Sequence, residues 1–243
     1  MNESSQPSAR EPAISCRGVV KYLGRRKFRT QVLHGLDVDI FAGEMTLLVG
    51  PSGCGKTTLI STIAGILKPD AGSTALFGTA IAGLGRRATT RFRGSNVGLV
   101  LQQFNLFPAL TAAENVAVPL LVLRQNAKHA YARAAELLAG LGLVAHAGKY
   151  PRELSVGEQQ RVAIARAIAH APRLIICDEP TAALDAASGR LVMQLLRDVT
   201  LSKDRAVLVV THDHRIFPFA DRIIHMDDGR IVRIEASAQR EAA

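Results

Sequence analysis

A run of small and polar residues from Gly50 to Thr57 has the types and spacing needed to hold a phosphate group. It matches the pattern GxxxxGK[ST] in full and lies between a strand-like apolar segment and a helix-like segment. Glycines let the backbone curl with its amides pointing inward, and the N-terminus of the following helix adds positive potential. We therefore predict that a nucleoside triphosphate binds to Gly50, Pro51, Ser52, Gly53, Cys54, Gly55, Lys56, Thr57 and Thr58.

Chemistry at such a site needs acidic groups as well, and the pair Asp178-Glu179 directly follows the apolar run Leu174–Cys177. Ligands of open α/β sheets bind at the carboxyl ends of the strands, so we expect this pair beside the phosphate loop. Lys56 is predicted to span the β- and γ-phosphates. Thr57 and Asp178 are predicted to hold Mg²⁺, and Glu179 to polarise the attacking water.

Cys54 lies inside the loop, and two environments fit its thiol. Backbone amides, a helix N-terminus and Lys56 would favour the reactive thiolate, which would then be alkylated readily and protected by bound MgATP. Alternatively, the side chain packs backward under the loop and never meets a reagent. Cys177, on the buried strand before Asp178, is expected to stay protonated and inert.

The elements that position these residues follow from hydrophobic patterning. Short apolar segments with basic turns between Ile14 and Ile40 predict strands and hairpins, and continuous apolar runs predict strands buried on both faces of a parallel sheet. From about 103 to 166 the pattern becomes helical, with a capping box at Thr111–Glu114. We predict strands at 44–49, 97–101, 174–177 and 206–210, helices at 58–67 and 186–199, and a terminal hairpin at 223–234.

Together these elements predict an α/β fold: a P-loop core with a mainly parallel sheet, an N-terminal antiparallel β subdomain and an inserted helical subdomain. The folded domain is expected over residues 13–235, with the helical insert at about 103–166 and loose tails at 1–12 and 236–243. The length of 243 residues and the 48% hydrophobic content suffice for one such domain.

Composition excludes several classes of protein. The longest apolar stretches are too short for a membrane-spanning helix, and the first ten residues lack the apolar core of a signal peptide. Three distant cysteines without a CxxC pair predict neither a disulfide framework nor a zinc site, and they favour a reducing cytosol.

The net charge is +9, and the basic residues form two clusters, at 17–29 and 86–93. Such clusters can attract nucleic acid, anionic lipid or a nucleotide, and they can equally be a solvated face. The chain has no Trp and only 3 Tyr, which argues against stacking on bases, so we predict no nucleic-acid partner.

Further segments resemble the motifs of ATP-binding cassette (ABC) ATPases, in the same order along about residues 14–234. The segment LSVGEQQR at Leu154–Arg161 is similar to the LSGGQ signature, and Asp178–Asp185 looks like the Walker B motif and D-loop. The resemblance implies ATP hydrolysis with ATP and Mg²⁺ as cofactors. It places Gln102 in the Q-loop, His212 at the switch histidine and Tyr22 against the adenine; Glu179, His212 and Gln102 would be catalytic, and Thr57, Gln102 and Asp178 would hold the metal.

Ser155 and Glu158 form a second capping box, so a helix with free amides, an anion site, is predicted to start there. One triphosphate already has its cradle in the phosphate loop, so this helix is predicted to serve the nucleotide of a second copy of the chain. The two chains would sandwich two ATP molecules head to tail, which agrees with the dimer that the resemblance implies. The nucleotide-binding residues from this side are predicted to be Ser155, Gly157, Glu158 and Asp185.

One residue departs from the signature pattern, because Val156 stands where its first glycine would be. A β-branched residue tolerates the first turn of a helix but not a positive φ. Either this position is not left-handed, or the γ-phosphate contact is altered.

The stretch Arg91–Val116 is similar to the region around the Q-loop in the macrolide-exporter and lipoprotein-releasing cassette family. That resemblance implies an integral-membrane permease on another chain and a peripheral position on the cytoplasmic side of the inner (plasma) membrane. Importer cassettes share much of this stretch, so the ATPase subunit of an amino-acid type importer is the alternative. Cassettes of DNA repair or of the ribosome do not fit the length, and Glu179 and His212 argue against a scaffold with weak hydrolysis.

An apolar cluster follows the Q-loop and contains Phe104, Leu106, Phe107 and Leu110. Large apolar groups in a loop usually mark a partner surface, so we predict that this segment forms the groove for a coupling helix of the permease. The alternative is that these side chains pack inside the helical insert.

Overall fold

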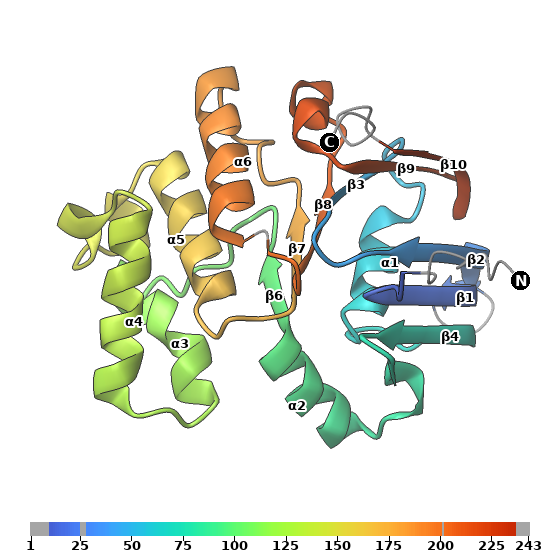
Figure 1. The fold of residues 1–243 in the computed structure, drawn as a ribbon, viewed down its shortest axis with the longest axis horizontal. Coiled ribbons are helices and arrows are strands. Elements are labelled where there is room, and N and C mark those ends of the chain that lie inside the picture. The colour runs from blue at the N-terminus through green and yellow to red at the C-terminus, as the bar shows by residue number, and fades with distance from the viewer. Residues whose placement is uncertain (1–9, 25–27, 201, 237–243) are drawn as a thin grey trace, which may run out of the picture.

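The computed structural model describes residues 10–24, 28–200 and 202–236, and the fold is built from two sheets and a group of helices (Figure 1). The antiparallel sheet lies at one end, the helices α3, α4 and α5 lie at the other, and a second sheet runs between them. Most of the two predicted tails lies outside the described residues.

The antiparallel sheet has the strand order β2-β1-β4-β5, with β1 (Ile14–Leu23), β2 (Thr30–Ile40), β4 (Ala71–Leu76) and β5 (Thr79–Ala80). β1 pairs with β2 from Ile14 opposite Ile40, at the open end of the hairpin, to Leu23 opposite Thr30, beside the connecting segment. This arrangement confirms the antiparallel N-terminal sheet. β4 and β5 were not predicted, because the sequence signals around Gly72 indicate only the end of a helix.

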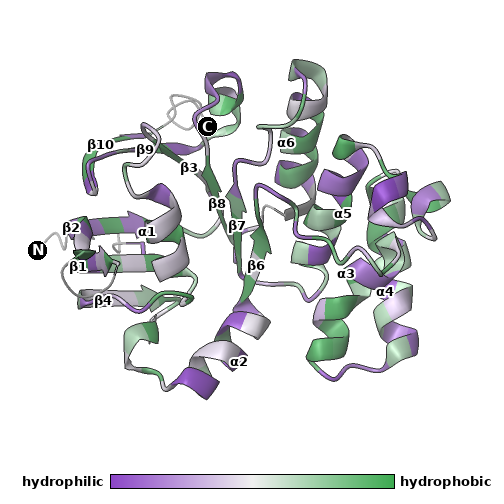
Figure 2. Cartoon of the chain, turned by 180° about the vertical axis from the view of Figure 1, so that it is seen from behind, coloured by the Kyte–Doolittle hydropathy of each residue, from purple (hydrophilic) through white to green (hydrophobic). Residues whose placement is uncertain are grey.

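The larger sheet has the order β10-β9-β3-β8-β7-β6. Its strands are β3 (Met45–Val49), β6 (Val97–Val100), β7 (Leu174–Asp178), β8 (Ala206–Val210), β9 (Arg222–Asp227) and β10 (Arg230–Ala236). All pairs are parallel except the terminal hairpin of β9 and β10. Every residue of β3, β7 and β8 is buried, and Figure 2 shows hydrophobic colour along these central strands. The predicted, mainly parallel sheet is confirmed.

Six α-helices are described in the resolved part of the chain: α1 (Lys56–Ile63), α2 (Arg86–Asn96), α3 (Ala112–Val122), α4 (Ala127–Gly140), α5 (Val156–Ile168) and α6 (Ala186–Thr200). Both predicted capping boxes are present, at Thr111 before α3 and at Ser155 before α5. Short 3-10 turns occupy 81–83, 144–146, 151–153 and 214–219. None of the helices in the described ranges is long and apolar enough to cross a membrane.

Two hydrophobic cores meet at the parallel sheet. Because side chains alternate along a strand, Leu47 of β3 joins the core under α3–α6, whereas Leu48 joins the core between α1 and the antiparallel sheet. The central strands are thus held from both faces. Their carboxyl ends carry the phosphate loop, Asp178 and the segment leading to His212, so packing on both faces fixes these groups relative to one another.

Candidate functional site

The predicted phosphate loop connects β3 to α1 and turns through three glycines with positive φ, at Gly50, Gly53 and Gly55. A Cβ atom at Gly50 would lie 2.0 Å from the Met226 carbonyl oxygen, so that position accepts only glycine without a backbone shift. Gly55 has a φ of 102° and lies directly before α1, whose free N–H groups open toward the loop. The loop therefore presents its backbone donors at one place.

Lys56 is buried and its ammonium is held inside the loop. The Nζ atom donates to the carbonyl oxygens of Gly50 and Pro51, at 2.8 Å each. These contacts put a positive charge within the curl of the loop. A phosphate group seated there would meet both backbone N–H donors and an ammonium.

Asp178 ends β7 and faces the start of α1. Its Oδ2 atom lies 3.5 Å from the Thr57 hydroxyl. Burial raises the pKa of Asp178 above its usual range, and the nearby Glu179 adds to this, while Thr57 and Lys56 act in the opposite direction. A hydroxyl and one buried carboxylate are hard oxygen donors in the small number that Mg²⁺ takes from a protein when phosphates and waters complete its shell. The residues present therefore fit this ion.

Glu179 and His212 form the closest pair of titratable groups at the site. His212 Nδ1 lies 2.7 Å from Glu179 Oε1, and the Glu179 amide donates to the Val210 carbonyl at 2.9 Å. Glu179 has a φ of 52°, in the left-handed region that few residues other than glycine adopt. Its second oxygen, Oε2, is buried and has no hydrogen-bond partner among the described residues. One carboxylate oxygen is thus oriented by histidine, and the other is available to a water molecule.

These groups line one cavity of about 640 Å³. It brings together most of the predicted loop residues with Gln102, Asp178, Glu179 and His212, although they come from four separate segments of the chain. Three apolar residues that the sequence analysis missed also line it, namely Leu23, Val32 and Val210. Their signal in the sequence is weak, because an apolar residue at a strand end is usually part of a core.

Tyr22 does not line this cavity. The guanidinium carbon of Arg29 lies 4.7 Å from the centre of the Tyr22 ring, and the Tyr22 amide donates to Asp70 Oδ2 at 2.9 Å. The neighbouring Leu23 faces the cavity instead. Successive residues of a strand point to opposite faces, which explains why one faces the cavity and the other does not.

Cys54 also lies outside the cavity lining, although it belongs to the loop. Its side chain is 6% exposed and joins the core between α1 and the antiparallel sheet. The Sγ atom is 3.8 Å from Lys56 Nζ. The structure thus agrees with the second of the two environments, in which the thiol packs beneath the loop. The first, an accessible thiol inside the phosphate cradle, is not what the geometry shows.

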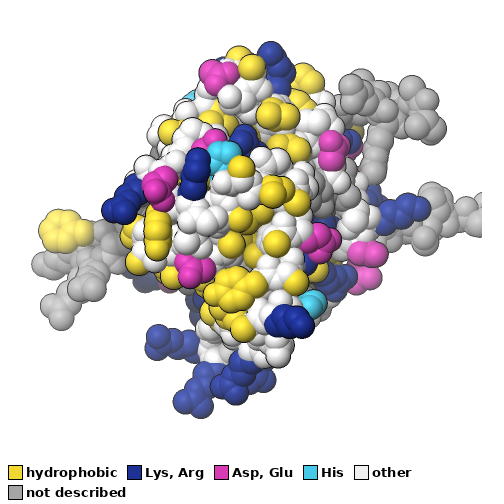
Figure 3. Space-filling model, turned by 90° about the vertical axis from the view of Figure 1, so that its left-hand side faces the viewer, with side chains coloured by type: hydrophobic (Ala, Val, Ile, Leu, Met, Phe, Trp, Pro, Cys, Tyr) yellow, Lys and Arg dark blue, Asp and Glu magenta, His cyan; other side chains and the backbone are white. Residues whose placement is uncertain are grey.

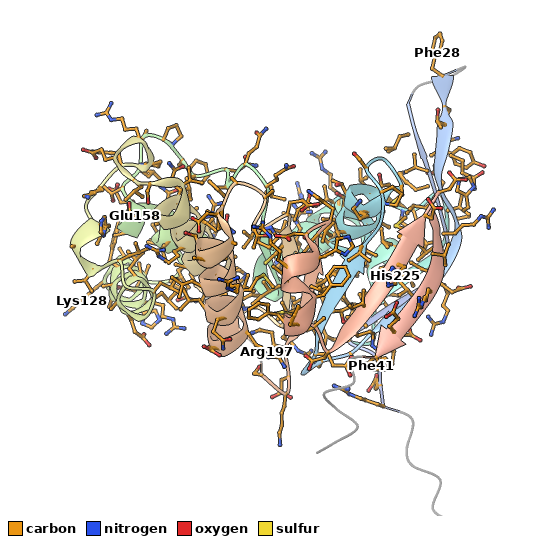
Figure 4. All side chains as sticks on the ribbon, turned by 90° about the horizontal axis from the view of Figure 1, so that it is seen from above. Phe28, Phe41, Lys128, Glu158, Arg197 and His225 are labelled. Carbon is orange, nitrogen blue, oxygen red and sulfur yellow. The ribbon has the colours of Figure 1, made fainter. Side chains whose placement is uncertain are left out.

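The signature segment starts α5, away from the cavity. The Ser155 hydroxyl accepts from the Glu158 amide at 3.3 Å, and Glu158 Oε2 accepts from the Ser155 amide at 2.8 Å. Figure 4 shows Glu158 at the helical end of the molecule, far from Phe28 at the tip of the β1–β2 hairpin. Val156 is the first residue of α5 and is not among the residues with positive φ, so this position is helical. Ser155, Gly157 and Glu158 do not line the cavity of their own chain.

Asp185 likewise lies outside the cavity, at the beginning of α6. Its carboxylate accepts from the Ser188 hydroxyl at 2.6 Å and from the Ala187 amide at 2.9 Å. These hydrogen bonds lower the pKa of Asp185, the Ser188 hydroxyl having the largest effect. The residue therefore caps α6 and remains exposed.

One residue that the sequence analysis did not single out connects the signature helix to the segment after Gln102. Arg166, on α5, donates to the carbonyl oxygens of Phe104 and Asn105, at 2.6 Å each. Both of these residues have positive φ, at 57° and 47°. Burial lowers the pKa of Arg166, and among the described residues no carboxylate forms an ion pair with it. The guanidinium thus holds a strained turn against α5.

A glycine-rich loop between a strand and a helix, facing an acidic strand end and a histidine, defines a nucleotide-binding ATPase of the P-loop class. A family model described as ABC transporter matches residues 33–182, which is more than half of the chain. The chain therefore belongs to the ABC transporter family.

Curated relatives narrow this assignment. The lipoprotein-releasing system ATP-binding protein LolD 2 of Caulobacter vibrioides is 40% identical over 221 residues, which cover 91% of this chain and 97% of the relative. The macrolide export ATP-binding/permease protein MacB of Azoarcus sp. is 38% identical over 229 residues, covering 94% of this chain but 35% of that longer protein. This chain is an ATP-hydrolysing ABC transporter ATPase of the macrolide-exporter and lipoprotein-releasing family.

The fold agrees with solved structures as well. The dimeric structure of the ATP-binding cassette MJ0796 bound to ADP and Pi superposes with a TM-score of 0.85 at 36% sequence identity, covering 92% of this chain and 98% of the other. The expectation of a P-loop α/β fold with an antiparallel sheet and inserted helices is confirmed.

Proposed function

We propose that this chain is the ATP-hydrolysing subunit of an exporting or mechanically coupled transporter, working as a head-to-tail dimer on a separate membrane permease. The observation that carries the proposal is the cavity of about 640 Å³ in which the loop, Asp178 and the Glu179–His212 pair meet. A cavity of this size accommodates a nucleotide. The relatives named for lipoprotein release and macrolide export support the export type.

In this proposal the loop residues from Gly50 to Thr58 cradle the phosphates of ATP, with Lys56 between the β- and γ-phosphates. Thr57, Asp178 and Gln102 would hold Mg²⁺, which would supply positive charge beside the phosphates. The raised pKa of Asp178 supports this role, because a cation beside a buried carboxylate restores the charged form.

Glu179 acts as the general base toward the attacking water. His212 holds one of its oxygens at 2.7 Å and leaves the partnerless Oε2 to take the proton. His212 also faces the cavity, so its other ring nitrogen can hydrogen-bond to the γ-phosphate. Gln102, in the turn that follows the edge strand β6, completes the ring of polar groups around the phosphate.

A second copy supplies the remaining contacts. The start of α5, with the Ser155 hydroxyl and the Gly157 amide, is an anion site that its own cavity does not use. Glu158 stabilises this helix start through the capping box, and Asp185, which accepts from the Ser188 hydroxyl, contacts the same nucleotide in this proposal. Val156 is 44% exposed and helical, so it leaves the amide of Gly157 open to a phosphate.

The adenine contact of Tyr22 belongs to the same proposal. The Tyr22 ring is half-buried and carries Arg29 on one face, so the base would take the place of that guanidinium.

The permease is proposed to dock on the helical end of the molecule, at the segment after Gln102. Phe107 is 49% exposed there, whereas Phe104 and Leu106 pack against the core beneath. Figure 3 shows hydrophobic side chains gathered on the helical end of the molecule. Val122, on α3, is 73% exposed. Docking of this kind would hold the chain at the cytoplasmic side of the inner membrane. The importer alternative differs in the permease and not in this site.

The experiment that tests this proposal is copurification of the chain with the permease it binds, followed by measurement of transport in vesicles. An exporter moves substrate away from the side on which ATP is supplied. Transport toward the ATP side would identify the importer alternative, and purified chain that binds no permease would contradict the proposed role as a subunit.

A further inference from the structure

The charged side chains of helix α2 are all positive. Arg86, Arg87, Arg91 and Arg93 all lie on this helix, and no residue of α2 is buried. The chain has no Asp or Glu anywhere between Asp70 and Glu114. We refer to the four arginines of α2 together with Lys68 as the α2 basic surface.

Most of these arginines make no side-chain contact with the described residues that stabilises the fold. Arg86, Arg87 and Arg91 are exposed, and within the described residues none of them takes part in an ion pair or a side-chain hydrogen bond. Arg93 donates to the Gly65 carbonyl at 3.2 Å and so ties α2 to the end of α1. Figure 3 shows dark blue side chains projecting from the lower tip of the molecule, where Figure 1 places α2.

A groove lies beside this helix, between α2, the end of α1 and the β4 strand. Its volume is about 590 Å³. Lys68, Arg86 and Arg93 line it together with the hydroxyls of Thr89 and Thr90, and no carboxylate is among its lining residues. Apolar side chains complete it, and one of them, Ile66, is 51% exposed. The groove thus joins cationic donors to an apolar edge.

The cationic side chains and the apolar edge together favour one of the anionic partners that a basic surface can have. Single-stranded nucleic acids are bound largely through stacking on aromatic side chains, and α2 offers only the half-buried Phe92. Guanidinium groups match the paired oxygens of a phosphate, and an exposed apolar residue beside them matches the acyl region just below a headgroup. Clusters of four or more basic residues on one helix are typical of contacts with anionic membranes.

We propose that the α2 basic surface binds the phosphate headgroups of an anionic phospholipid bilayer. This proposal goes beyond the function proposed above, because it involves neither nucleotide nor permease. The same contact would keep the chain at the membrane surface while it searches for its permease. The contact would depend on charge, so added salt, which shortens the Debye length, should weaken the binding of the chain to the membrane.

The test is cosedimentation of the purified chain with vesicles of phosphatidylglycerol and phosphatidylcholine, compared with vesicles of phosphatidylcholine alone. We expect binding only to the former. Each basic residue at an anionic surface contributes about a fivefold change in binding, so Arg87→Gln with Arg91→Gln should weaken it about 25-fold. Because Arg87 and Arg91 are exposed, this pair should leave the thermal midpoint unchanged, which checks that the variant folds.

The matched control is Arg124→Gln with Lys128→Gln, which removes the same charge from exposed positions of the helical end. The affinity of this control for the vesicles should stay within about twofold of that of the wild type, and the lower net charge accounts for a change of that size. Equal losses in both pairs would show that only the net charge of +9 matters and would overturn the proposal. So would loss confined to a variant of the basic residues 25–27, equal binding to both vesicles, or binding to polyglutamate but not to vesicles.

Discussion

At the scale of one residue, the buried carboxylate of Asp178 is expected to lower the stability of the chain at neutral pH. Burial raises its pKa above the ordinary value of 3.8, so the folded chain binds this proton more tightly than the unfolded chain. Stability then falls as pH rises from the ordinary pKa through the raised one, and at pH 7 the ionised carboxylate is a cost. Asp178→Asn should therefore raise the thermal midpoint at pH 7, by about 2–4 °C if the gain is near 1 kcal/mol.

Two controls accompany this variant. As the pH falls toward the ordinary pKa, the folded wild-type chain takes up this proton, so the difference between the two proteins should shrink. Asp185→Asn should have the opposite sign at pH 7, because hydrogen bonds from Ser188 lower the pKa of Asp185. A lower thermal midpoint for Asp178→Asn in the absence of nucleotide would show that the buried charge is stabilised rather than strained.

The cysteines give a second prediction at this scale. Burial raises the pKa of Cys16 to about 12 and raises that of Cys177 further, while Cys54 packs under the loop at 6% exposed. All three thiols should therefore react slowly with a maleimide in the native chain and quickly after denaturation. Mass spectrometry of the labelled chain measures this. Rapid native labelling of Cys54 that MgATP suppresses would restore the accessible thiol that the sequence suggested.

At the scale of elements, Arg166 shows how α5 is joined to the segment that follows Gln102. Replacing it with Met removes a charged donor from the carbonyls of Phe104 and Asn105, which should cost about 1–3 kcal/mol of unfolding free energy. Hydrogen exchange should rise at residues 103–107, and Arg166→Lys should recover part of the protection. The exposed Arg152→Met is the control. Unchanged exchange at 103–107 would rule out this role of Arg166.

The segment after Gln102 is also where the permease is proposed to dock, and this can be tested by mutation. Phe107→Asp places a charge on a surface that is 49% exposed, so the thermal midpoint should stay within about 2 °C while copurification with the permease is lost. A charge on an apolar contact is costly only when a partner covers it. Val232→Asp, at a residue 62% exposed on β10, is the control and should leave copurification intact. Normal copurification of Phe107→Asp would remove this segment from the interface.

Elements with strong apolar patterning could be predicted from the sequence, and those without it could not. The buried strands β3, β7 and β8 are continuous apolar runs, and α4 buries Ala130, Ala134, Leu137 and Leu138 at helical spacing. No residue of helix α2 is fully buried, so its sequence contains no apolar stripe that would predict a helix. Its arginines were recognised as a cluster, but their arrangement on one helix came only from the structure.

At the scale of the whole molecule, the phosphate loop was predictable because its residues are consecutive and their backbone forms the site. Contacts that depend on tertiary geometry were less predictable from the sequence. Tyr22 was predicted at the nucleotide, for example, but Leu23 lines the cavity. The signature helix shows the limit most clearly. Ser155 was predicted at a nucleotide, yet its own chain offers it none, because α5 starts outside the cavity. If the site is divided between two copies, as proposed, one chain cannot complete it.

That division can be tested by mixing two defective chains. Lys56→Ala removes the ammonium from the loop, and Ser155→Arg fills the N-terminus of α5, so neither variant alone should hydrolyse ATP. In a head-to-tail dimer of the two variants, one site combines both defects and the other combines the intact loop with the intact helix start. An equimolar mixture should therefore regain roughly a quarter of the wild-type activity, since half of the dimers are mixed and each has one sound site of two. The mixture of Lys56→Ala with itself at doubled concentration is the control. No recovery on mixing, or full activity of Ser155→Arg alone, would show that α5 does not serve the nucleotide of a second copy.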